Sequence, residues 1–353
     1  MEPPFPFEWS RPEHQNLYWF RDRMHFPNPC TPLSASIDAP AFSEGTTAGY
    51  RALGAPVRVH VFTPNGYWYL APELDVPLED LPRVREEAVG RMLPMLTRQT
   101  ELWEREYLPE VMRHNAAIRE RDYGAMTDRE LAAHLDELRA SRARMWEVHM
   151  RAVGPVMAAA GQFVNIYEQI FGDDGGAYVL MQGFPNKSVE SGVELWELSR
   201  LAAERPAVRD VILNAPPASA LARLESSEDG RAFLAAFRAY LDEYGWRSDA
   251  FELADPTWVE APVVPLTLVR EYLRKGEDAN PAVREDRARA ERERLEAEIE
   301  PRTAGHPLEG MFRFLQQAAR QYVPIQENHN FYIDQMHTAL LRRPLMEAGR
   351  RLA

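Results

Sequence analysis

Charged side chains stand among aromatic residues at four places in this sequence, and the first place lies near the N-terminus. The segment Trp19–Ser34 sets Arg21, Asp22 and His25 between aromatic residues, just before a run of prolines. Arg21 could clamp an anion with Asp22 beside it, and His25 could accept a proton near neutral pH. The same residues also suit an arginine–aspartate pair and a packed histidine that hold an N-terminal arm in place, and composition alone favours this structural alternative.

The second cluster is a loop with glycine and proline, Val179–Ser188, between two predicted helices. Its Gln182, Asn186 and Lys187 are candidate ligand contacts, because polar loops at such junctions can line a pocket. Ser188 stands where a hydroxyl can cap the following helix. A plain interhelical turn explains the same residues and is the favoured structural alternative.

The third cluster, Tyr244–Trp258, follows a glycine that ends a helix and alternates charged with aromatic side chains. Arg247, Asp249 and Glu252 stand among large aromatic residues, of which Trp246 is a candidate ligand contact. Charged groups in such surroundings lose water, and their pKa values can then shift. We predict an anion contact at Arg247 and a base at Glu252, and a structural salt bridge accounts for these residues about as well.

The fourth cluster is Gln316–Asp334. Its Arg320, Glu327 and Asp334 recur at heptad-like spacing, so they would share one helix face if the helix continued through Pro324. An arginine–carboxylate network on such a face can order a pocket and tune a general base, for which Glu327 is the candidate. A structural polar ladder between helices is an equal alternative. The further ligand contacts predicted in this cluster are Asn328, Asn330 and Tyr332.

Helices must carry most of these residues, because apolar side chains recur at three- and four-residue spacing from Pro77 onward. Leu81–Arg119 begins this pattern, with kinks or boundaries at its later prolines. The capping box Thr127–Glu130 opens a long, deeply buried helix that ends near Gly172. Further helices are predicted at about 189–203, 206–213, 217–224, 228–243, 263–274, 281–300, 306–322 and 331–352.

The first 56 residues carry little periodicity, apart from a short amphipathic stretch at His14–His25, and predict an extended arm with one short helix. Val57–Leu70 is rich in β-branched and aromatic residues around Asn65-Gly66, a dipeptide that tolerates positive φ, and predicts a β-hairpin. The fold class is therefore mainly α, a multi-helix domain with an N-terminal extended arm and a small β-hairpin. We divide the chain into the arm with its hairpin, residues 1–76, and the helical domain, residues 77–353.

The segment 284–300 is the most highly charged part of the chain, with twelve charged residues of seventeen. Opposite charges stand four residues apart, as at Glu285 and Arg289, which supports an isolated helix. This pattern predicts a solvated helix face.

Composition limits the classes of function. The 41 basic and 54 acidic residues give a net charge of −13, which disfavours nucleic acid and membrane surfaces as partners. With one cysteine, no signal-peptide pattern and no long apolar stretch, the chain is expected to be cytoplasmic. The sequence contains no GxxxxGK[ST], GxGxxG after a strand, HExxH, CxxC or GxSxG motif, so no phosphate loop, metal ligand or α/β-hydrolase elbow is predicted.

Taken in order, the four clusters resemble the central substrate-binding region of phosphoenolpyruvate-synthase-like dikinases, and most closely the rifampicin-phosphotransferase-like group. The stretches that carry the resemblance are RDRMHFPNPCTPLS, LMQGFPNKSVESGVELWELSRLA, YGWRSDAFELADPTW and IQENHNFYIDQMHTALLRRPLMEAGRRLA. In that family an ATP-binding domain phosphorylates a histidine on a small swivelling domain, which carries the phosphoryl group to an acceptor on the helical domain. The resemblance implies that this chain supplies the acceptor site.

The sequence departs from the family pattern in two ways. The Thr/Ser-Gly-Gly-…-Ser-His loop of the mobile domain and the ATP-grasp portion are not found in it. We therefore expect no cofactor on this chain itself, ATP and Mg²⁺ on a partner domain or subunit in cis or in trans, and no activity by this chain alone. Trp246 stands where relatives usually have histidine or arginine, so the family role of that position is not carried over.

Phosphoryl transfer requires mainly positioning and charge stabilisation, which arginines, amides and one base can supply. Because aromatic residues and methionine flank the clusters, we predict an organic hydroxyl acceptor that is aromatic or phenolic. A pyruvate or phosphoenolpyruvate site is the alternative within the enzyme class, and a non-catalytic helical scaffold that binds another protein is the alternative outside it. The candidate phosphoryl contacts are Arg21, Lys187 and Arg247, and the candidate bases are Glu327, Glu252 and His25.

Overall fold

The longest helix begins and ends at the residues that the sequence marks. The computed structural model describes residues 9, 11–173, 175–248 and 251–353, and α5 occupies Asp128–Phe171. The Thr127 hydroxyl accepts a hydrogen bond from the Glu130 N–H (3.3 Å), and the Glu130 carboxylate accepts one from the Thr127 N–H (2.7 Å). Gly172 ends the helix with a φ of 87°. Most apolar side chains after Val148 are buried, so the predicted helix and its burial are confirmed.

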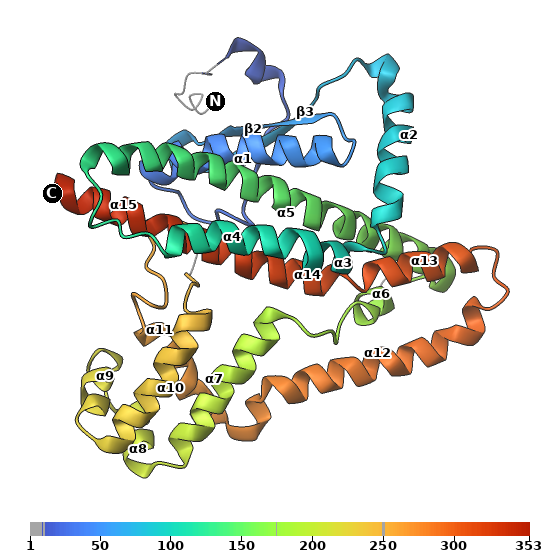
Figure 1. Ribbon diagram of the computed structural model, residues 1–353. Coiled ribbons are helices and arrows are strands. Elements are labelled where there is room, and N and C mark those ends of the chain that lie inside the picture. The colour runs from blue at the N-terminus through green and yellow to red at the C-terminus, as the bar shows by residue number, and fades with distance from the viewer. Residues whose placement is uncertain (1–8, 10, 174, 249–250) are drawn as a thin grey trace, which may run out of the picture.

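Helix α1 (Pro32–Ala52) runs along α5, in a region predicted to be an extended arm, so that prediction was wrong for these residues (Figure 1). Small residues and Pro40 replace the usual apolar stripe, which hides the helix in the sequence. The small residues allow close packing, because a Cβ on Gly45 would collide with the Ala143 carbonyl oxygen. A Cβ on Gly49 would likewise collide with the Met150 Cβ of α5. The two helix backbones therefore approach each other closely.

Three short strands form an antiparallel sheet in the order β1–β3–β2. Strands β2 (Val57–Phe62) and β3 (Tyr69–Leu74) are the predicted hairpin, which is confirmed. Asn65 and Gly66 make its turn with φ angles of 50° and 80°.

The third strand lies in the arm. Strand β1 (Phe20–Arg21) pairs with the free edge of β3, with Phe20 opposite Leu70. The helix predicted at His14–His25 is therefore wrong: its only helical part is the single 3-10 turn Pro12–Asn16. Hydrogen bonding to the sheet edge replaces the helical hydrogen bonds that the amphipathic pattern suggested.

Most of the remaining helices follow the predicted order, with ends that differ by a few residues. Two were not predicted: α6 (Gly175–Leu180), and α14 (Tyr322–His329), which occupies the gap between the predicted helices 306–322 and 331–352. A π-helical turn at Trp103–Tyr107 precedes α4, and a π-helical segment at Asn330–His337 joins α14 to α15. Short 3-10 turns occupy Pro64–Gly66, Leu78–Asp80, Leu93–Met95 and Gly276–Ala279. The helices are α2 (Leu81–Met92), α3 (Gln99–Leu102), α4 (Leu108–Arg119), α6 (Gly175–Leu180), α7 (Lys187–Ala203), α8 (Pro206–Asn214), α9 (Pro217–Glu225), α10 (Glu228–Tyr244), α11 (Val263–Lys275), α12 (Pro281–Thr303), α13 (Glu309–Ala319), α14 (Tyr322–His329) and α15 (Thr338–Leu352).

Figure 1 shows how these helices are arranged. The sheet and α1 cover one side of α5, whereas α4 and the α13–α15 row lie on its other side. Helices α7–α11 pack as a second group, and α12 leads back from it to α13. The core of the second group, with Phe233 and Phe237, continues to Phe331 and Leu340 of the row. The mainly helical fold class with its small hairpin is confirmed, and the division at residues 76 and 77 stays a prediction.

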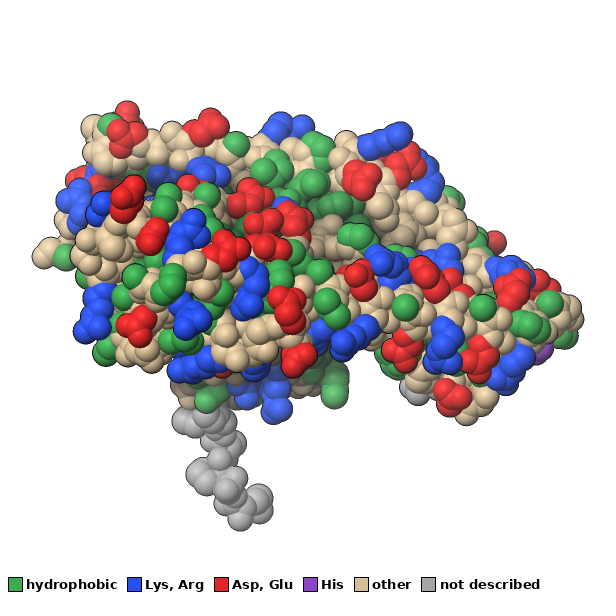
Figure 2. Space-filling model, turned by 90° about the horizontal axis from the view of Figure 1, so that it is seen from below, with side chains coloured by type: hydrophobic (Ala, Val, Ile, Leu, Met, Phe, Trp, Pro, Cys, Tyr) green, Lys and Arg blue, Asp and Glu red, His purple; other side chains and the backbone are tan. Residues whose placement is uncertain are grey.

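Charge is dispersed over the face that the second group presents. Figure 2 shows acidic and basic side chains interspersed there, so the net charge of −13 is not gathered into one patch on this face. None of the helices in the described part of the chain combines the length and apolar character that a membrane crossing requires.

Candidate functional site

The N-terminus of α7 meets α14, and this contact brings together residues of the second and fourth sequence clusters. The Asn186 carboxamide oxygen caps α7 by accepting hydrogen bonds from the N–H groups of Ser188 and Val189, both at 3.1 Å. The Asn328 carboxamide oxygen accepts one from the Lys187 N–H at 2.9 Å. The first N–H groups of α7 are therefore occupied by the protein itself.

A chain of hydrogen bonds links Arg247, Ser188 and Glu327 beside this helix end. The Ser188 hydroxyl donates to Glu327 Oε2 (2.5 Å), and Arg247 Nη2 donates to the Ser188 oxygen (3.3 Å). Burial lowers the pKa of Arg247, but a guanidinium remains charged at neutral pH. Its Nε is buried and has no hydrogen-bond partner among the described residues. The arrangement joins a carboxylate, a hydroxyl and an incompletely satisfied cation.

Lys187 lies next to this chain but is neutralised by its neighbours. Its Nζ is 2.7 Å from Glu190 and 3.1 Å from Glu243. Nζ also lies 5.9 Å from the centre of the Tyr332 ring. Burial alone would lower the pKa of Lys187, but hydrogen bonds to the two carboxylates outweigh it and raise the pKa. Lys187 is therefore a weaker candidate for an anion contact than Arg247.

A cleft of about 490 Å³ opens beside Glu327 and Ser188. The loop residues Gln182 and Asn186 line it, and α12 forms the opposite wall. The cleft also has apolar and aromatic walls, to which Phe184, Tyr272 and Val323 contribute. It can hold a small molecule with a flat apolar part and a polar end.

Helix α12 positions the loop, although its charged sequence predicted a solvated face. Arg292 is buried and donates to the carbonyl oxygens of Gln182 (3.0 Å) and Gly183 (2.6 Å), while its guanidinium stacks over Phe184. Gly183 has a φ of 73° and lies against the backbone of Arg289, so a side chain would not fit there. Most charged residues of 284–300 are exposed, as the predicted solvated face requires, but Arg292 and Ile299 form a second, buried face of α12.

Glu285 is a cleft residue that the sequence analysis missed. Its Oε1 is buried without a hydrogen-bond partner among the described residues, and burial raises the pKa of the carboxyl group. The charge pattern placed Glu285 in a pair with Arg289, but the structure pairs Arg289 with Asp286 instead. The cleft thus contains two carboxyl groups, those of Glu285 and Glu327.

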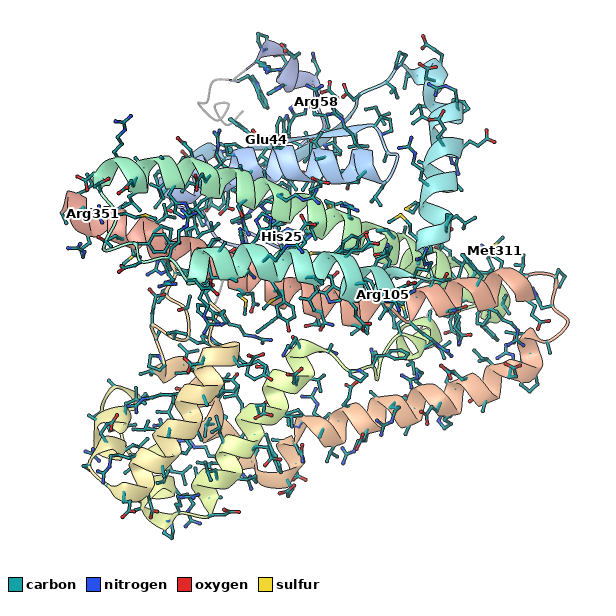
Figure 3. All side chains as sticks on the ribbon, in the orientation of Figure 1. His25, Glu44, Arg58, Arg105, Met311 and Arg351 are labelled. Carbon is teal, nitrogen blue, oxygen red and sulfur yellow. The ribbon has the colours of Figure 1, made fainter. Side chains whose placement is uncertain are left out.

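The first sequence cluster lies elsewhere, where the arm packs against α1 and α5. The Asp22 carboxylate accepts hydrogen bonds from the N–H groups of Met24 and His25, and its second oxygen is 2.8 Å from His25 Nδ1. Arg21 donates to the Pro27 carbonyl oxygen (2.7 Å) and stacks on Tyr67. The His25 side chain, labelled in Figure 3, is mostly buried, with 17% of its surface exposed. The packed histidine of the structural alternative is present, but Asp22 pairs with His25 instead of with an arginine among the described residues.

Glu252 from the third cluster also lies apart from the cleft and secures the start of α1. It accepts hydrogen bonds from the Thr31 N–H (3.2 Å), the Thr31 hydroxyl (2.8 Å), the Ser34 hydroxyl and the Ala254 N–H (3.2 Å). We call Thr31, Ser34 and Glu252 the anchor cluster. Asp249 lies outside the described residues.

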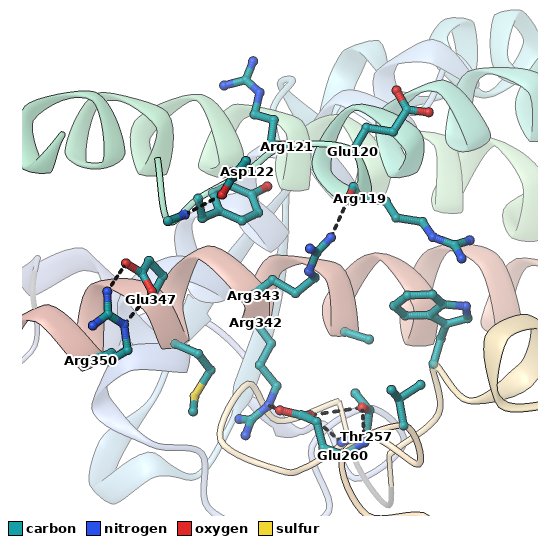
Figure 4. A pocket seen from close by; sticks show the side chains of 16 residues that line it. Arg119, Glu120, Arg121, Asp122, Thr257, Glu260, Arg342, Arg343, Glu347 and Arg350 are labelled. Carbon is teal, nitrogen blue, oxygen red and sulfur yellow. Dashed lines mark hydrogen bonds and ion pairs between the residues drawn. The ribbon is translucent and has the colours of Figure 1, made fainter. Parts of the chain in front are cut away.

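Trp246 lines a second and larger hollow of about 890 Å³, between the end of α4 and α15 (Figure 4). Two of its arginines pair with carboxylates, Arg342 with Glu260 (2.9 Å) and Arg350 with Glu347 (2.7 Å), whereas Arg343 donates to the Arg119 carbonyl oxygen (2.5 Å). Arg119 stacks over the Trp246 ring. Of the described site residues that were predicted from the sequence, Trp246 is the only one that lines this hollow.

The predicted common face of the fourth cluster does not form. Helix α13 ends at Ala319, before Pro324, and the later π-helical segment changes the register again. Arg320 consequently pairs with Glu296 of α12 (2.7 Å), whereas Glu327 faces Ser188 and Asp334 lies in the core.

Asp334 belongs to a buried cluster that the sequence analysis did not find. His149 Nδ1 is 3.0 Å from Asp334 Oδ1, and His329 Nε2 is 3.3 Å from Asp334 Oδ2. Burial lowers the pKa of His149 to about 4, so this imidazole is neutral at pH 7.

Asn330, a predicted ligand contact, points its carboxamide oxygen into a buried position without a hydrogen-bond partner among the described residues.

Residues 148–327 match the family described as the rifampicin phosphotransferase fourth domain, which is just over half of the chain. The chain belongs to this family. It is 32% identical over 359 residues to chondramide synthase of Chondromyces crocatus, an alignment that covers 99% of this chain and 9% of that protein. It is 26% identical over 357 residues to the uncharacterized phosphotransferase YvkC of Bacillus subtilis (strain 168), which covers 96% of this chain and 40% of that protein.

The family match confirms the resemblance that the four sequence clusters suggested. It covers the loop, the third cluster and Glu327, so the whole Arg247–Ser188–Glu327 chain lies within the fourth-domain family stretch. The chain spans less than half the length of each of these two relatives. It is therefore a phosphotransferase-family domain.

Proposed function

We propose that this chain binds the hydroxyl acceptor of a phosphotransferase in the cleft between α7, α12 and α14. The observation that supports this role is the hydrogen-bonded chain Arg247–Ser188–Glu327, in which Ser188 and Glu327 line the cleft and Arg247 contacts Ser188. A carboxylate that already accepts a hydroxyl hydrogen bond can accept the same bond from a substrate, and a nearby buried guanidinium stabilises transferred negative charge.

In the proposed step, the acceptor hydroxyl attacks a phosphoryl group carried on a phosphohistidine of another domain or subunit. The bond from phosphorus to the histidine nitrogen breaks, and a bond from phosphorus to the acceptor oxygen forms. Glu327 takes the hydroxyl proton as general base, and the released histidine nitrogen takes up a proton. Arg247 holds the phosphoryl oxygens. ATP and Mg²⁺ act on the partner domain that charges the histidine.

The cleft favours a neutral acceptor with an aromatic part. Phe184 and Tyr272 supply flat apolar walls, whereas Glu285 and Glu327 place two carboxyl groups in the same space. Arg284 is the one cation among the described lining residues, so the two carboxyl groups outnumber it and disfavour an anionic substrate such as pyruvate. A phenol or another aromatic alcohol avoids this repulsion.

The proposal is tested by adding an ATP-grasp and phosphohistidine partner of the family, ATP and Mg²⁺ to this chain, with a panel of aromatic alcohols and with pyruvate. We expect transfer to an aromatic alcohol, followed as phosphorylated product, only when all components are present. Glu327→Gln should lower kcat by about 10²- to 10⁴-fold with little change in acceptor affinity, because it removes the base and retains the shape.

A matched control is Glu298→Gln on the exposed side of α12, where the carboxylate pairs only with Arg294 among the described residues. It should leave kcat unchanged. Full activity of Glu327→Gln, or transfer to pyruvate alone, would contradict the proposal.

A further inference from the structure

Three buried side chains from two segments converge beneath α1. His149 lies on α5, His329 ends α14, and Asp334 belongs to the π-helical segment. Their exposed fractions are 5%, 1% and 3%. One ligand atom from each lies within 4.8 Å of the other two, a spread that small side-chain rotations can close onto an ion about 2.0–2.2 Å from each atom.

The protonation of His329 is fixed on one side of its ring. Its Nδ1 is 2.8 Å from the Ile325 carbonyl oxygen, and because a carbonyl oxygen only accepts, Nδ1 must carry a hydrogen. Nε2 is buried, faces Asp334 Oδ2 at 3.3 Å and makes no hydrogen bond among the described residues. Metal-binding histidines characteristically donate their second N–H to a carbonyl oxygen in this way. With Nδ1 protonated, Nε2 either carries a second proton or presents its lone pair to a metal ion, and Asp334 favours a positive charge beside it in both cases.

The buried charge of Asp334 also favours a cation at this position. A buried carboxylate requires a compensating positive charge. Among the described residues its ion-pair partners are the imidazoles of His149 and His329. The buried Arg142 is not its partner, because that guanidinium pairs with Asp38 at 2.6 Å. His25, whose ring centre is 5.7 Å from that of His149, is paired with Asp22.

We propose that His149, His329 and Asp334 bind a divalent transition-metal ion of the zinc class. Two imidazole nitrogens and one carboxylate suit Zn²⁺ or a similar borderline ion, whereas Mg²⁺ and Ca²⁺ prefer oxygen ligands. The ion joins α5 to the end of α14 and to the π-helical segment, a helix defect of the kind often found at functional sites. His149 and His329 are 180 residues apart in the sequence, so no local spacing motif indicates the site. This inference does not depend on the proposed acceptor site.

The test uses the 353-residue chain, stripped with a chelator and titrated with Co²⁺ or Zn²⁺ by calorimetry. We expect one ion per chain, a visible Co²⁺ absorption spectrum typical of nitrogen and oxygen ligands, and a higher Tm. His149→Gln and Asp334→Asn should each weaken binding by about 100-fold or more. The control is His337→Gln, which alters an equally buried histidine that is bonded to Asn115 at 2.8 Å, and it should retain the affinity of the unaltered chain.

Absence of stoichiometric binding to the unaltered chain would overturn the proposal, and a proton on His329 would then be the cation. Equal affinity of His149→Gln and the unaltered chain would also overturn it. If the variants fail to fold, nitrogen-15 NMR of the histidines in the unaltered chain decides the question. Zn²⁺ must shift the resonances of His149 and His329 and leave that of His337 in place, and unshifted resonances would refute the site.

Discussion

Glu252 and Glu327 are both glutamates that the sequence offers as bases, and the structure places them in opposite situations. In the anchor cluster, Glu252 accepts four hydrogen bonds from Thr31, Ser34 and its own turn. In the cleft, Glu327 accepts one, from Ser188, among the described residues. A carboxylate whose lone pairs are all used by the protein holds the fold together, whereas one with free lone pairs at a cleft can receive a substrate proton.

Two arginines, the fully buried Arg142 and the partly buried Arg247, also differ in their partners. Arg142 on α5 is fully buried and pairs with Asp38 of α1, whereas Arg247 reaches Ser188 by one long hydrogen bond and is not paired with a carboxylate closely enough to form a salt bridge among the described residues. The residue types are the same in both regions. The difference between the two arginines is that a carboxylate pairs with Arg142 and none pairs with Arg247 among the described residues.

The largest expected effect on stability comes from breaking the Asp38–Arg142 pair. Arg142→Met should lower the free energy of unfolding by about 3–5 kcal/mol, because it leaves the Asp38 carboxylate buried and uncompensated. Arg247→Met should cost clearly less, since it leaves Ser188 and Glu327 bonded to each other. Urea unfolding followed by circular dichroism measures both variants.

If Arg142→Met lowered the free energy of unfolding less than Arg247→Met, the assignment of Arg142 as the structural arginine and Arg247 as the functional one would be wrong. Arg313→Ala serves as a surface control. Its exposed pairs with Glu300 and Glu309 should contribute nothing measurable.

The sequence predicts elements whose signals are local. The capping box at Thr127–Glu130, the glycine at position 172 and the Asn65-Gly66 turn each act within a few residues, and each prediction is confirmed. Helix α1 was not predicted because Gly45 and Gly49 serve to let α5 pack closely, and this tertiary contact is not visible in the local sequence. A helix that is held by close backbone approach has no apolar stripe to detect.

The candidate site could be predicted in part for the same reason. Asn186 and Ser188 stand at a recognisable helix start, and Glu327 and Asn328 were named from their polar surroundings. Their meeting depends on the turn of the chain at Gln321 and on the loop held by Arg292, and both are tertiary features. The common face predicted for Arg320, Glu327 and Asp334 did not form because that prediction assumed one continuous helix.

The second prediction compares the two glutamates directly. Glu252→Gln should lower the free energy of unfolding by about 1–3 kcal/mol, because the carboxamide NH₂ cannot accept the hydrogen bonds that one carboxylate oxygen receives. Glu327→Gln should change stability less, since its single hydrogen bond can be made to the remaining oxygen. Thermal and urea unfolding of both variants provide the measurement, and equal losses would show that Glu327 is as structural as Glu252.

The smallest effect is a dependence of stability on pH through His25. Burial alone would lower the pKa of His25, but the hydrogen bond and charge of Asp22, with a contribution from Asp334, outweigh it and raise the pKa above the ordinary value. The protonated pair therefore stabilises the arm fully below about pH 6.5, and this stabilisation is lost as the pH rises through the pKa of the folded state. The free energy of unfolding should fall with increasing pH in that window and should fall less in His25→Gln. If Glu327 is the base, His25→Gln should leave the pH profile of phosphoryl transfer unchanged. A displaced profile would show that His25 takes part in the transfer and does not only hold the arm in place.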